Sequence, residues 1–503
     1  MDYQKLFNTV RYLRPRQVFY QIFYRIRKAG YKRYRRPGSG LCLVFKTSPI
    51  DKPTCLKQDE FSFLNISKAF PGWDDASDGM LWTYNLNYMD WLCQSGMREK
   101  LGLFWMDKFI AELPDNSVGL DPYPTALRGV NWVKFFVLYP EAMNEKRLDS
   151  LYSQYRLLEK KLEYHILGNH LLENAYSLYI GGSFFSDSRM KKKAYSLLLK
   201  QLRRQILPDG GHFEQSPMYH CILLDRLLDC INIAPTAELE SYASRMLGHL
   251  ESLKWVDGSI PMFNDSAIGI APSADQIFDY AKRLGIGWTA RPMKESGYRR
   301  MTCGRIEAVV DIGNITATYQ PGHTHSDALS YELKIGGSPV VADTGISTYD
   351  KTPRRQYERS SAAHNAVVVD GMDSYEVWGG FRVGKRGKVS VSSEDRGSVN
   401  ATLRFNGITH NRIFEISDNS FTVSDIVAGG NSRQSLIHLA PEVGDVRVKG
   451  GVVYAEGFRI EIEGADSVSL EDCQISREYN RFLSAKVLVI TFTERMSYKI
   501  IID

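Results

Sequence analysis

The sequence predicts an α+β multidomain protein, with a helical N-terminal part followed by an antiparallel β-sandwich. Between about residues 80 and 285, apolar residues recur three and four positions apart, as in Leu151, Tyr155 and Leu158. This spacing places them on one face of a helix. Short loops rich in Gly, Pro and Asp separate several helices of medium length, expected near 97–112, 190–206, 218–233, 237–254 and 274–284. Such helices favour stacked hairpins, either an open solenoid or a closed α/α toroid.

After about residue 300 the apolar period falls to two, which is typical of strands. Paired glycines and Asp-Gly turns separate the strand-like segments, in the manner of an antiparallel sandwich. The segments are 308–312, 331–335, 366–369, 421–423 and 487–490. We therefore expect three regions: an N-terminal arm over 1–36, the helical domain over 37–295, and the β-sandwich over 296–503.

The predicted arm carries most of the positive charge of the chain. It holds eleven Lys and Arg residues against one acid, whereas the whole chain of 503 residues has a net charge of +5. Phe19, Ile22, Phe23 and Ile26 recur at helical spacing among the arginines, which indicates an amphipathic helix. Two alternatives follow: the helix docks on the body with a solvated basic face, or it makes peripheral contact with an anionic membrane or polyanion.

The remaining composition narrows the class of protein. Seven scattered cysteines without a CxxC pair argue against both a disulfide framework and a cysteine zinc site. No apolar run of about 18 residues indicates a spanning helix, and the first residues lack the pattern of a secretory signal. We expect a cytoplasmic or membrane-peripheral protein. Because the basic character is confined to the arm, we expect no nucleic-acid partner; the oligomeric state stays open.

Three of the ten histidines gather in one short stretch of the predicted sandwich. His325, Asp343 and His364 lie where a β-hairpin could bring them together, and their donors are those that Zn²⁺ prefers. This arrangement would leave His323 free beside the metal. The alternative is a set of separately paired histidines at strand ends.

Another group of candidates opens a predicted helix at Asn169, His170 and Glu173. An amide and an imidazole on one side of the first turns can bind a carboxylate, with Glu173 holding the tautomer of His170. The alternative is helix capping by Asn169 with His170 in the core.

A polar, aromatic segment leads into the next predicted helix. Tyr219 could serve as a general acid or base, and Glu214 or Gln215 could bind sugar hydroxyl groups. The alternative is a capped turn in which Ser216 is the N-cap and Pro217 the first helical residue.

Two further sets of aromatic, amide and guanidinium groups suit an acidic sugar. One precedes the motifs above and comprises Asn85, Tyr88, Arg128, Asn131 and Trp132. The other lies between Asp343 and His364 and comprises Tyr349, Arg355, Tyr357 and Arg359. Buried aromatic rings with paired arginines, or a solvated charged loop, are the alternatives.

Taken in order, these motifs resemble those of the heparinase II/III and alginate lyase superfamily of polysaccharide lyases. They are Asn169-His170 with Glu173, Ser216-Pro217-x-Tyr219-His220, Gly322-His323-x-His325-x-Asp327, Asp343-x-Gly345 and His364-Asn365. The resemblance implies an N-terminal α/α toroid and a C-terminal antiparallel β-sandwich. It also implies β-elimination in a uronic-acid-containing polysaccharide, either a glycosaminoglycan or an exopolysaccharide.

The resemblance assigns roles to the residues that carry it. Asn169 and His170 would neutralise the uronate carboxylate, and Tyr219 would donate a proton to the departing O4 or also take the C5 proton. His323 is the other acid/base candidate, and Tyr349 or Tyr357 a second tyrosine. The resemblance also implies a mainly structural Zn²⁺ on the three predicted ligands.

Other functions remain open on the sequence alone. A non-catalytic polysaccharide-binding or assembly protein would keep the fold without turnover. A uronyl C5-epimerase would share the proton abstraction and return the proton to C5. A glycoside hydrolase is disfavoured because no pair of carboxylates stands out in the motif regions.

Overall fold

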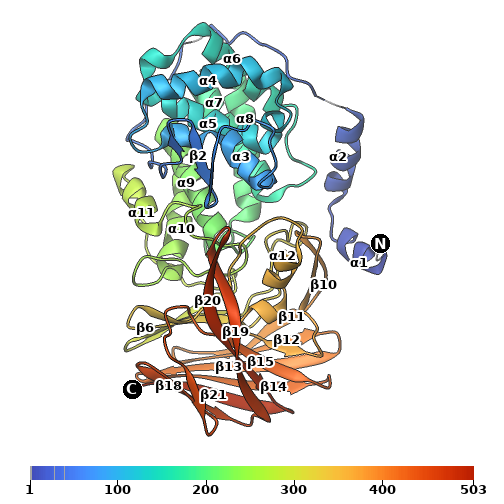
Figure 1. Cartoon of the computed structure of the whole chain (residues 1–503). Helices are drawn as coiled ribbons and strands as arrows, with labels where there is room; N and C mark the ends of the chain where they lie inside the picture. The colour runs from blue at the N-terminus through green and yellow to red at the C-terminus, as the bar shows by residue number, and fades with distance from the viewer. Residues whose placement is uncertain (1–2, 28, 39, 43) are drawn as a thin grey trace.

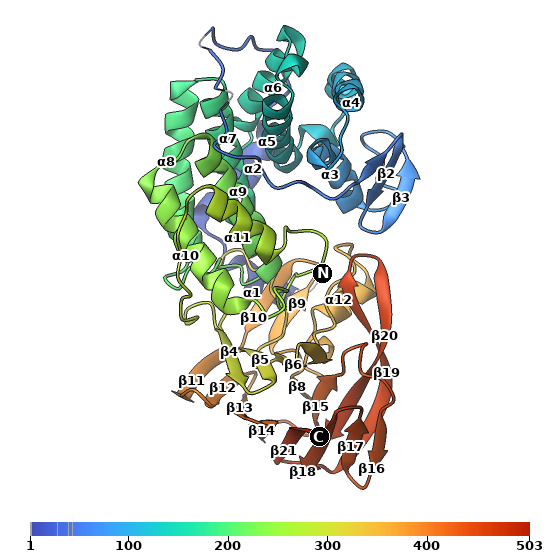
Figure 2. The same cartoon turned by 90° about the vertical axis from the view of Figure 1, so that its left-hand side faces the viewer.

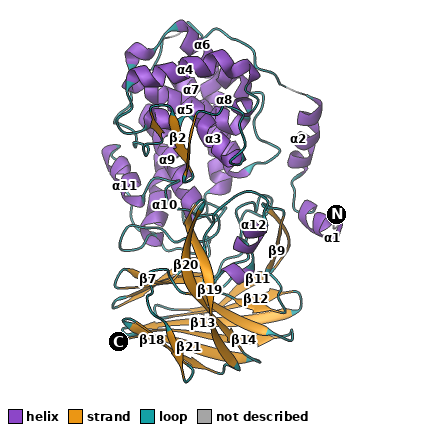
Figure 3. Ribbon diagram, in the orientation of Figure 1, coloured by secondary structure: helices purple, strands orange, loops and turns teal. Residues whose placement is uncertain are grey.

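The computed structural model describes residues 3–27, 29–38, 40–42 and 44–503. Residues 1, 2 and 28 of the predicted arm lie outside these ranges. Helices fill the upper half of the molecule and strands the lower half, so the change of period in the sequence marks a real change of fold (Figures 1 and 3). Within the described ranges, no helix combines the length and apolar character needed to cross a bilayer.

The helical half consists of two layers of antiparallel hairpins. Each helix of the inner row packs on the next one: α3 (Met80–Tyr88), α5 (Pro122–Leu138), α7 (Gly168–Phe184) and α9 (Pro217–Ile233). The outer row comprises α4 (Glu99–Glu112), α6 (Glu145–Leu158), α8 (Ser188–Gln205) and α10 (Ala237–Leu253), and α11 (Ala274–Arg283) packs on α9. This two-layer arrangement is the α/α toroid.

The four inner helices share one apolar core, and α9 among them begins at a side-chain cap. At α9 the Ser216 hydroxyl accepts a hydrogen bond from the Tyr219 N–H at 3.2 Å, and Pro217 occupies the first position. Most of α7 is buried because neighbours cover it on both sides. The start of α7 is tight: Leu167 has a φ of 68°, and a Cβ at Gly168 would collide with Glu214.

One element of the N-terminal region was not expected from the sequence. A small antiparallel sheet precedes the first toroid helix and lies at the rim of the helical layers near α3 and α4 (Figure 2). Its strands are β1 (Leu56–Lys57), β2 (Glu60–Phe63) and β3 (Ile66–Ala69). Phe61 and Phe63 point from β2 into the toroid core, which explains why so short a sheet is stable there.

The lower half is an antiparallel β-sandwich, as predicted. Its largest sheet has the order β11-β12-β13-β14-β21-β18-β17-β16, and two four-stranded sheets have the orders β19-β20-β15-β8 and β4-β5-β6-β7. These strands are β4 (Tyr298–Cys303), β5 (Ile306–Asp311), β6 (Tyr331–Ile335), β7 (Ser338–Val341), β8 (Val367–Val369), β11 (Lys388–Glu394), β12 (Ser398–Phe405), β13 (Ile408–Ser417), β14 (Ser420–Ala428), β15 (Arg433–His438), β16 (Arg447–Lys449), β17 (Val452–Ala455), β18 (Phe458–Glu463), β19 (Ser467–Glu478), β20 (Arg481–Thr491) and β21 (Arg495–Ile502). One apolar core joins the inner faces of the sheets.

Two smaller elements of the lower half face the toroid. A ribbon of β9 (Tyr375–Trp378) and β10 (Arg382–Arg386) and the short helix α12 (Pro353–Glu358) lie on the toroid side of the sandwich (Figure 1). The last toroid helix ends at Arg283 and β4 begins at Tyr298, so the boundary predicted near residue 295 falls in the connecting segment.

The N-terminal arm forms two helices, α1 (Tyr3–Val10) and α2 (Pro15–Ile26), on one flank of the molecule (Figure 1). α1 packs on β10, where the Trp378 indole donates to the Thr9 hydroxyl at 3.1 Å. α2 lies against the toroid, where Tyr20 contacts the Tyr164 ring and the Tyr24 hydroxyl donates to the Leu162 carbonyl. One face of each helix therefore docks on the body, but on α2 the docked face is not the apolar one expected from the sequence, because Phe19, Ile22 and Ile26 are exposed.

Gln17 joins the two halves of the molecule through its side-chain amide. Its Nε2 donates to the Ile166 carbonyl of the toroid at 3.0 Å and to the Tyr319 carbonyl of the sandwich at 3.2 Å. The side chain is buried. Since Ile166 precedes Asn169 and Tyr319 precedes His323, this contact lies next to both predicted catalytic segments.

Gln17→Ala is expected to lower the free energy of unfolding by about 1–3 kcal/mol, because it leaves one buried and one partly buried carbonyl without this donor. Thermal or denaturant unfolding measures the loss. Gln21→Ala, at an exposed position of the same helix, is the matched control and should change little. Equal stability of the two variants would contradict this role for Gln17.

Candidate functional site

The candidate site is a cavity of about 110 Å³ where the inner toroid helices meet the sandwich. Tyrosines dominate its wall: Tyr88 comes from α3, Tyr123 from α5, Tyr219 from α9, Tyr349 from the segment before α12, and Tyr479 from the turn between β19 and β20. A larger hollow of about 820 Å³ shares Lys52, Ile270 and Pro272 with it. Together the two adjoining spaces could hold a longer ligand than the tyrosine cavity alone.

Tyr219, His323 and Asn169 meet at this junction, as the motifs predict. The rings of Tyr219 and His323 lie face to face, with centroids 3.9 Å apart and planes tilted by 31°. The amide nitrogen Nδ2 of Asn169 lies 3.3 Å from Nε2 of His323. A phenol, an imidazole and an amide from two domains thus share one small volume.

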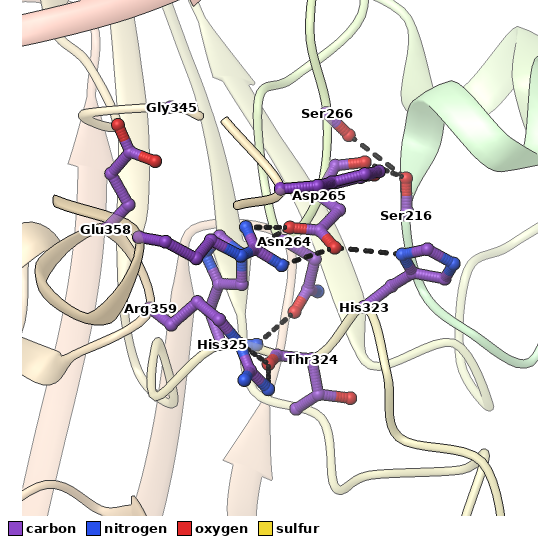
Figure 4. A network of polar contacts seen from close by, with 12 residues as sticks. Ser216, Asn264, Asp265, Ser266, His323, Thr324, His325, Gly345, Glu358 and Arg359 are labelled. Carbon is purple, nitrogen blue, oxygen red and sulfur yellow. Dashed lines mark hydrogen bonds and ion pairs between the residues drawn. The ribbon is translucent and has the colours of Figure 1, made fainter. Parts of the chain in front are cut away.

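Asp265 fixes the orientation of His323. Its carboxylate contacts Nδ1 of His323 and Nε2 of His325, each at 2.8 Å, and it also receives both terminal nitrogens of Arg355. Figure 4 shows Asp265 between the two histidines, with Asn264 and Ser266 on either side of it in the chain. Every one of these side chains is buried.

The protonation of Asp265 decides the tautomer of His323. Burial alone would raise the Asp265 pKa, but Arg355 and the two histidines outweigh it and hold this pKa well below its usual value. An ionised carboxylate only accepts hydrogen bonds, so the proton of a neutral His323 lies on Nδ1. Nε2 then presents its lone pair towards Asn169.

The Tyr219 hydroxyl is held in its protonated form. Burial raises the pKa of Tyr219 above its ordinary value, and this outweighs the hydrogen bond from Tyr349 and the charge of Arg355. The hydroxyl oxygens of Tyr219 and Tyr349 are 3.3 Å apart. Tyr349 is therefore the second tyrosine of the site. Tyr357, the other candidate, lies on α12 and does not line the cavity.

His170 lies beside Asn169 but receives its orientation from an unexpected residue. Its Nδ1 is 2.9 Å from the Glu163 carboxylate, and its ring packs on Tyr123 with centroids 4.4 Å apart. Burial lowers the His170 pKa, but the Glu163 carboxylate outweighs burial and the pKa is raised. The prediction that Glu173 holds the tautomer of His170 was wrong, because Glu173 is buried next to Arg226, at 3.4 Å.

Glu214 was predicted to bind a sugar hydroxyl group, but its side chain is buried and positions Asn169 instead. Its two carboxylate oxygens accept hydrogen bonds from the Asn169 backbone N–H at 2.9 Å and from Nδ2 at 2.7 Å. Oδ1 of Asn169 is buried without a partner, which leaves one polar atom of this amide for a bound ligand.

Three predicted substrate-binding residues belong to the framework instead. Arg128 is buried in the toroid and donates to Gln154 and to the carbonyls of Asn87 and Gly119. Trp132 is part of the apolar core. Gln215 donates to the Ser296 carbonyl and accepts from the Thr316 N–H, joining the two domains. Their polar groups already have partners, which the sequence pattern could not show.

Arg359, another predicted substrate-binding residue, also belongs to the framework. It is buried and donates through Nε and Nη2 to the Thr324 carbonyl, so it supports the loop that carries His323 and His325. Asn85, Tyr88 and Asn131, in contrast, line the cavity, and Oδ1 of Asn131 is buried without a partner. Their placement agrees with the predicted ligand contact.

The predicted zinc ligands are close together but do not form a complete ligand set. The rings of His325 and His364 have centroids 5.3 Å apart, and Nδ1 of His325 and Nε2 of His364 are buried without partners. The Asp343 carboxylate, however, accepts from Nδ1 of His364 and from the Gly345 N–H. Across the described residues, no three His, Cys, Asp and Glu side chains are arranged to hold a metal ion. The third donor does not fit, and zinc stays a prediction.

Zinc binding is tested by element analysis of protein purified without chelators. The prediction is about one zinc ion per chain. The double variant His325→Ala, His364→Ala should lose the metal, whereas His410→Ala, a buried histidine paired with Asp425, should retain it. Folded wild-type protein that stays free of zinc at saturating zinc concentration would contradict the prediction.

Sequence reasoning missed Asp265, Glu163 and Tyr479. Asp265 lies in the loop Asn264-Asp265-Ser266, and its partners are 58 to 90 positions away in the chain. Glu163 precedes the motif that it supports. The sequence indicated only that a buried histidine needs a partner to orient its ring. It did not indicate which residue that partner is.

In this chain Tyr219, His323 and Asn169 meet where the two domains join. The fold and the site place this protein among those that join an α/α toroid to an antiparallel β-sandwich. Family models bear this out: residues 134–283 match the heparinase II/III N-terminus, and residues 286–502 match the heparinase II/III-like C-terminal domain. The chain belongs to the heparinase II/III-like family.

Individual relatives are distant. A heparin-sulfate lyase of Pedobacter heparinus is 26% identical over 239 residues, which cover 40% of this chain and 36% of that protein. One of Bacteroides stercoris is 20% identical over 322 residues, covering 56% of this chain and 47% of that protein. The matches thus span less than half the length of these curated relatives.

Solved structures share the fold over most of the chain. A crystal structure of heparinase III has a TM-score of 0.66 at 15% identity, covering 86% of this chain and 79% of that one. At such identity the likeness establishes the fold alone.

Proposed function

We propose that this protein is a polysaccharide lyase that cleaves a uronic-acid-containing polysaccharide by β-elimination. The observation that carries the proposal is the stacking of Tyr219 on His323 beside Asn169, at 3.9 Å and 3.3 Å. The family membership and the named activity of the relatives, heparin-sulfate lyases, support the same reaction class.

In the proposed reaction, Nε2 of His323 takes the proton from C5 of the uronate. The C–H electron pair forms the C4–C5 double bond, the C4–O4 bond breaks, and the Tyr219 hydroxyl donates its proton to O4. Asp265 keeps the His323 lone pair directed into the site and stabilises the imidazolium that forms. The raised pKa of Tyr219 suits a proton donor in the resting enzyme.

The developing negative charge on the uronate requires neutralisation. His170 supplies the donor for this charge, an imidazole whose pKa is raised by Glu163. A preorganised donor of this kind contributes about 3–4 kcal/mol to the stabilisation of a transition state. Asn169 directs Nδ2 to Glu214 and His323, so its free Oδ1 would accept a hydrogen bond from a sugar hydroxyl group. Asn85, Tyr88 and Asn131 would contact the sugar along the cavity wall.

The test follows the ultraviolet absorbance of unsaturated uronate ends across a panel of heparan sulfate, chondroitin sulfate, hyaluronan and alginate. Chain cleavage with this chromophore supports the lyase. Deuterium entering the polymer from D₂O without cleavage would instead identify an epimerase. Tight binding of a uronan without cleavage and without deuterium incorporation would instead identify a non-catalytic binding protein.

A further inference from the structure

The arm helices expose an unusual concentration of apolar side chains. Seven of the twenty large apolar side chains exposed in the described chain lie in α1 and α2: Tyr3, Phe7, Val10, Val18, Phe19, Ile22 and Ile26. Ile26 is 80% exposed, Phe7 68% and Phe19 59%. Single exposed apolar residues are ordinary, but a group this dense on two short neighbouring helices indicates an interaction surface.

These side chains form one continuous face on each helix. On α2, Val18, Ile22 and Ile26 follow each other at four-residue spacing, opposite the docked face of Gln17, Tyr20 and Tyr24. On α1, Tyr3, Phe7 and Val10 recur at four and three positions, opposite the buried Asn8. Both helices lie on the same flank of the molecule (Figure 1), and the side chains of their outer faces are exposed.

Positive charge lies at one end of this outer face. Arg25 and Arg27 border it at the end of α2, and the exposed Lys32, Arg33 and Arg35 follow on the segment whose Tyr34 N–H donates to Ser153 of α6. Over the ranges that the structure describes, none of these five side chains pairs with a carboxylate, although Arg27 lies over the Phe23 ring at 5.6 Å. Described acidic side chains are absent from residues 3–38 altogether.

We propose that the outer face of α1 and α2 docks the protein on an anionic lipid bilayer. Apolar side chains enter the boundary between headgroups and acyl chains, and the flanking cations bind the anionic headgroups. A second protein copy would suit the apolar stripe but not its dense like charge, which would repel itself across a symmetric contact. An acidic polysaccharide would suit the charge but not the apolar stripe.

The experiment is co-sedimentation of the full chain with phosphatidylcholine vesicles containing about one third phosphatidylglycerol, against pure phosphatidylcholine. The wild type is expected to bind the anionic vesicles at least about tenfold more tightly, and high salt should weaken this binding. The apolar variant Phe19→Asp, Ile22→Asp, Ile26→Asp should lose at least about tenfold in affinity for them.

Matched controls separate this surface from general hydrophobicity and charge. Phe104→Asp, Leu138→Asp, Ile426→Asp removes exposed apolar groups elsewhere and should bind normally. Arg25→Glu, Lys32→Glu, Arg33→Glu should weaken binding at least about tenfold, whereas Lys192→Glu, Lys193→Glu, Lys200→Glu, with the same net charge, should not. All substituted side chains are exposed, so unchanged thermal unfolding verifies folding.

Three results would overturn the proposal. One is sedimentation with anionic vesicles that does not differ between the wild type and the apolar arm variant, whether both stay in the supernatant or both bind. Another is a dimer, seen by light scattering, that the apolar variant abolishes while vesicles are not bound. The last is binding to a uronan that depends on the arm cations but not on the apolar residues, without vesicle binding.

Discussion

Tyr219→Phe is expected to lower kcat by about 10²–10⁴-fold, the usual contribution of a positioned acid–base group. The variant keeps the aromatic ring that stacks on His323 and removes the hydroxyl that would protonate O4. Substrate affinity should change little, because the ring and the remaining cavity wall are preserved. Initial rates of unsaturated-product formation, with binding measured separately, give both quantities.

Tyr349→Phe is the companion variant, since its hydroxyl lies 3.3 Å from that of Tyr219. It should reduce kcat far less if Tyr219 alone transfers the proton. Tyr139→Phe, whose hydroxyl donates to the Met97 carbonyl away from the cavity, controls for loss of a phenol in general. A Tyr219→Phe enzyme with more than half of the wild-type rate would show that another group protonates O4.

Asp265→Asn is expected to lower both stability and turnover. Its carboxylate neutralises buried Arg355 and accepts from His323 and His325, and breaking a buried ion pair of this kind costs about 3–5 kcal/mol. In the folded fraction, kcat should fall by about 10²-fold or more, because the tautomer and orientation of His323 are no longer fixed. Denaturant unfolding and initial rates measure the two effects.

The buried cluster of Asp425, Arg412 and His410 in the sandwich supplies a matched control. Asp425 accepts from Arg412 at 2.7 and 2.8 Å and from His410 at 2.7 Å, but lies far from the cavity in the sheet of β13 and β14. Asp425→Asn should therefore cost similar stability yet leave kcat of the folded fraction unchanged. Equal losses of kcat in both variants would refute the positioning role of Asp265.

The pH dependence of stability gives an independent readout for Asp265. Its pKa is lower in the folded protein than in the unfolded chain, where an aspartate titrates near about 3.9. The ionised carboxylate thus contributes stability above that pH, and the contribution is lost as the pH falls towards the folded value. Asp265→Asn should flatten the acid limb of the stability curve, as measured by denaturant unfolding below about pH 5.

Periodicity was sufficient to predict a helical half followed by a β-sandwich, whereas the choice of a toroid over a solenoid came from the family resemblance. The three- and four-residue spacing of the toroid and the two-residue spacing of the sandwich both arise from burial of one face, which local sequence records. The strands β1–β3 were not predicted, because two to four residues per strand are too few to establish a period. Segments with chemical motifs were also recognisable: Asn169, Tyr219 and His323 do meet.

Side-chain partners were much harder to predict than the motifs. Arg128 and Arg359 carry charge that suits an acidic sugar, yet tertiary contacts bury both side chains completely. Glu163 replaces Glu173 beside His170 because the chain reverses before α7, and helical spacing cannot describe a loop. Contacts such as Asp265–Arg355, separated by 90 positions, become visible only in three dimensions.

The amide of Gln17 ties the carbonyl before Asn169 to the carbonyl before His323, and those two residues face each other across the junction at 3.3 Å. The helix α2, which belongs to neither domain, thus holds the toroid and the sandwich together next to these two residues.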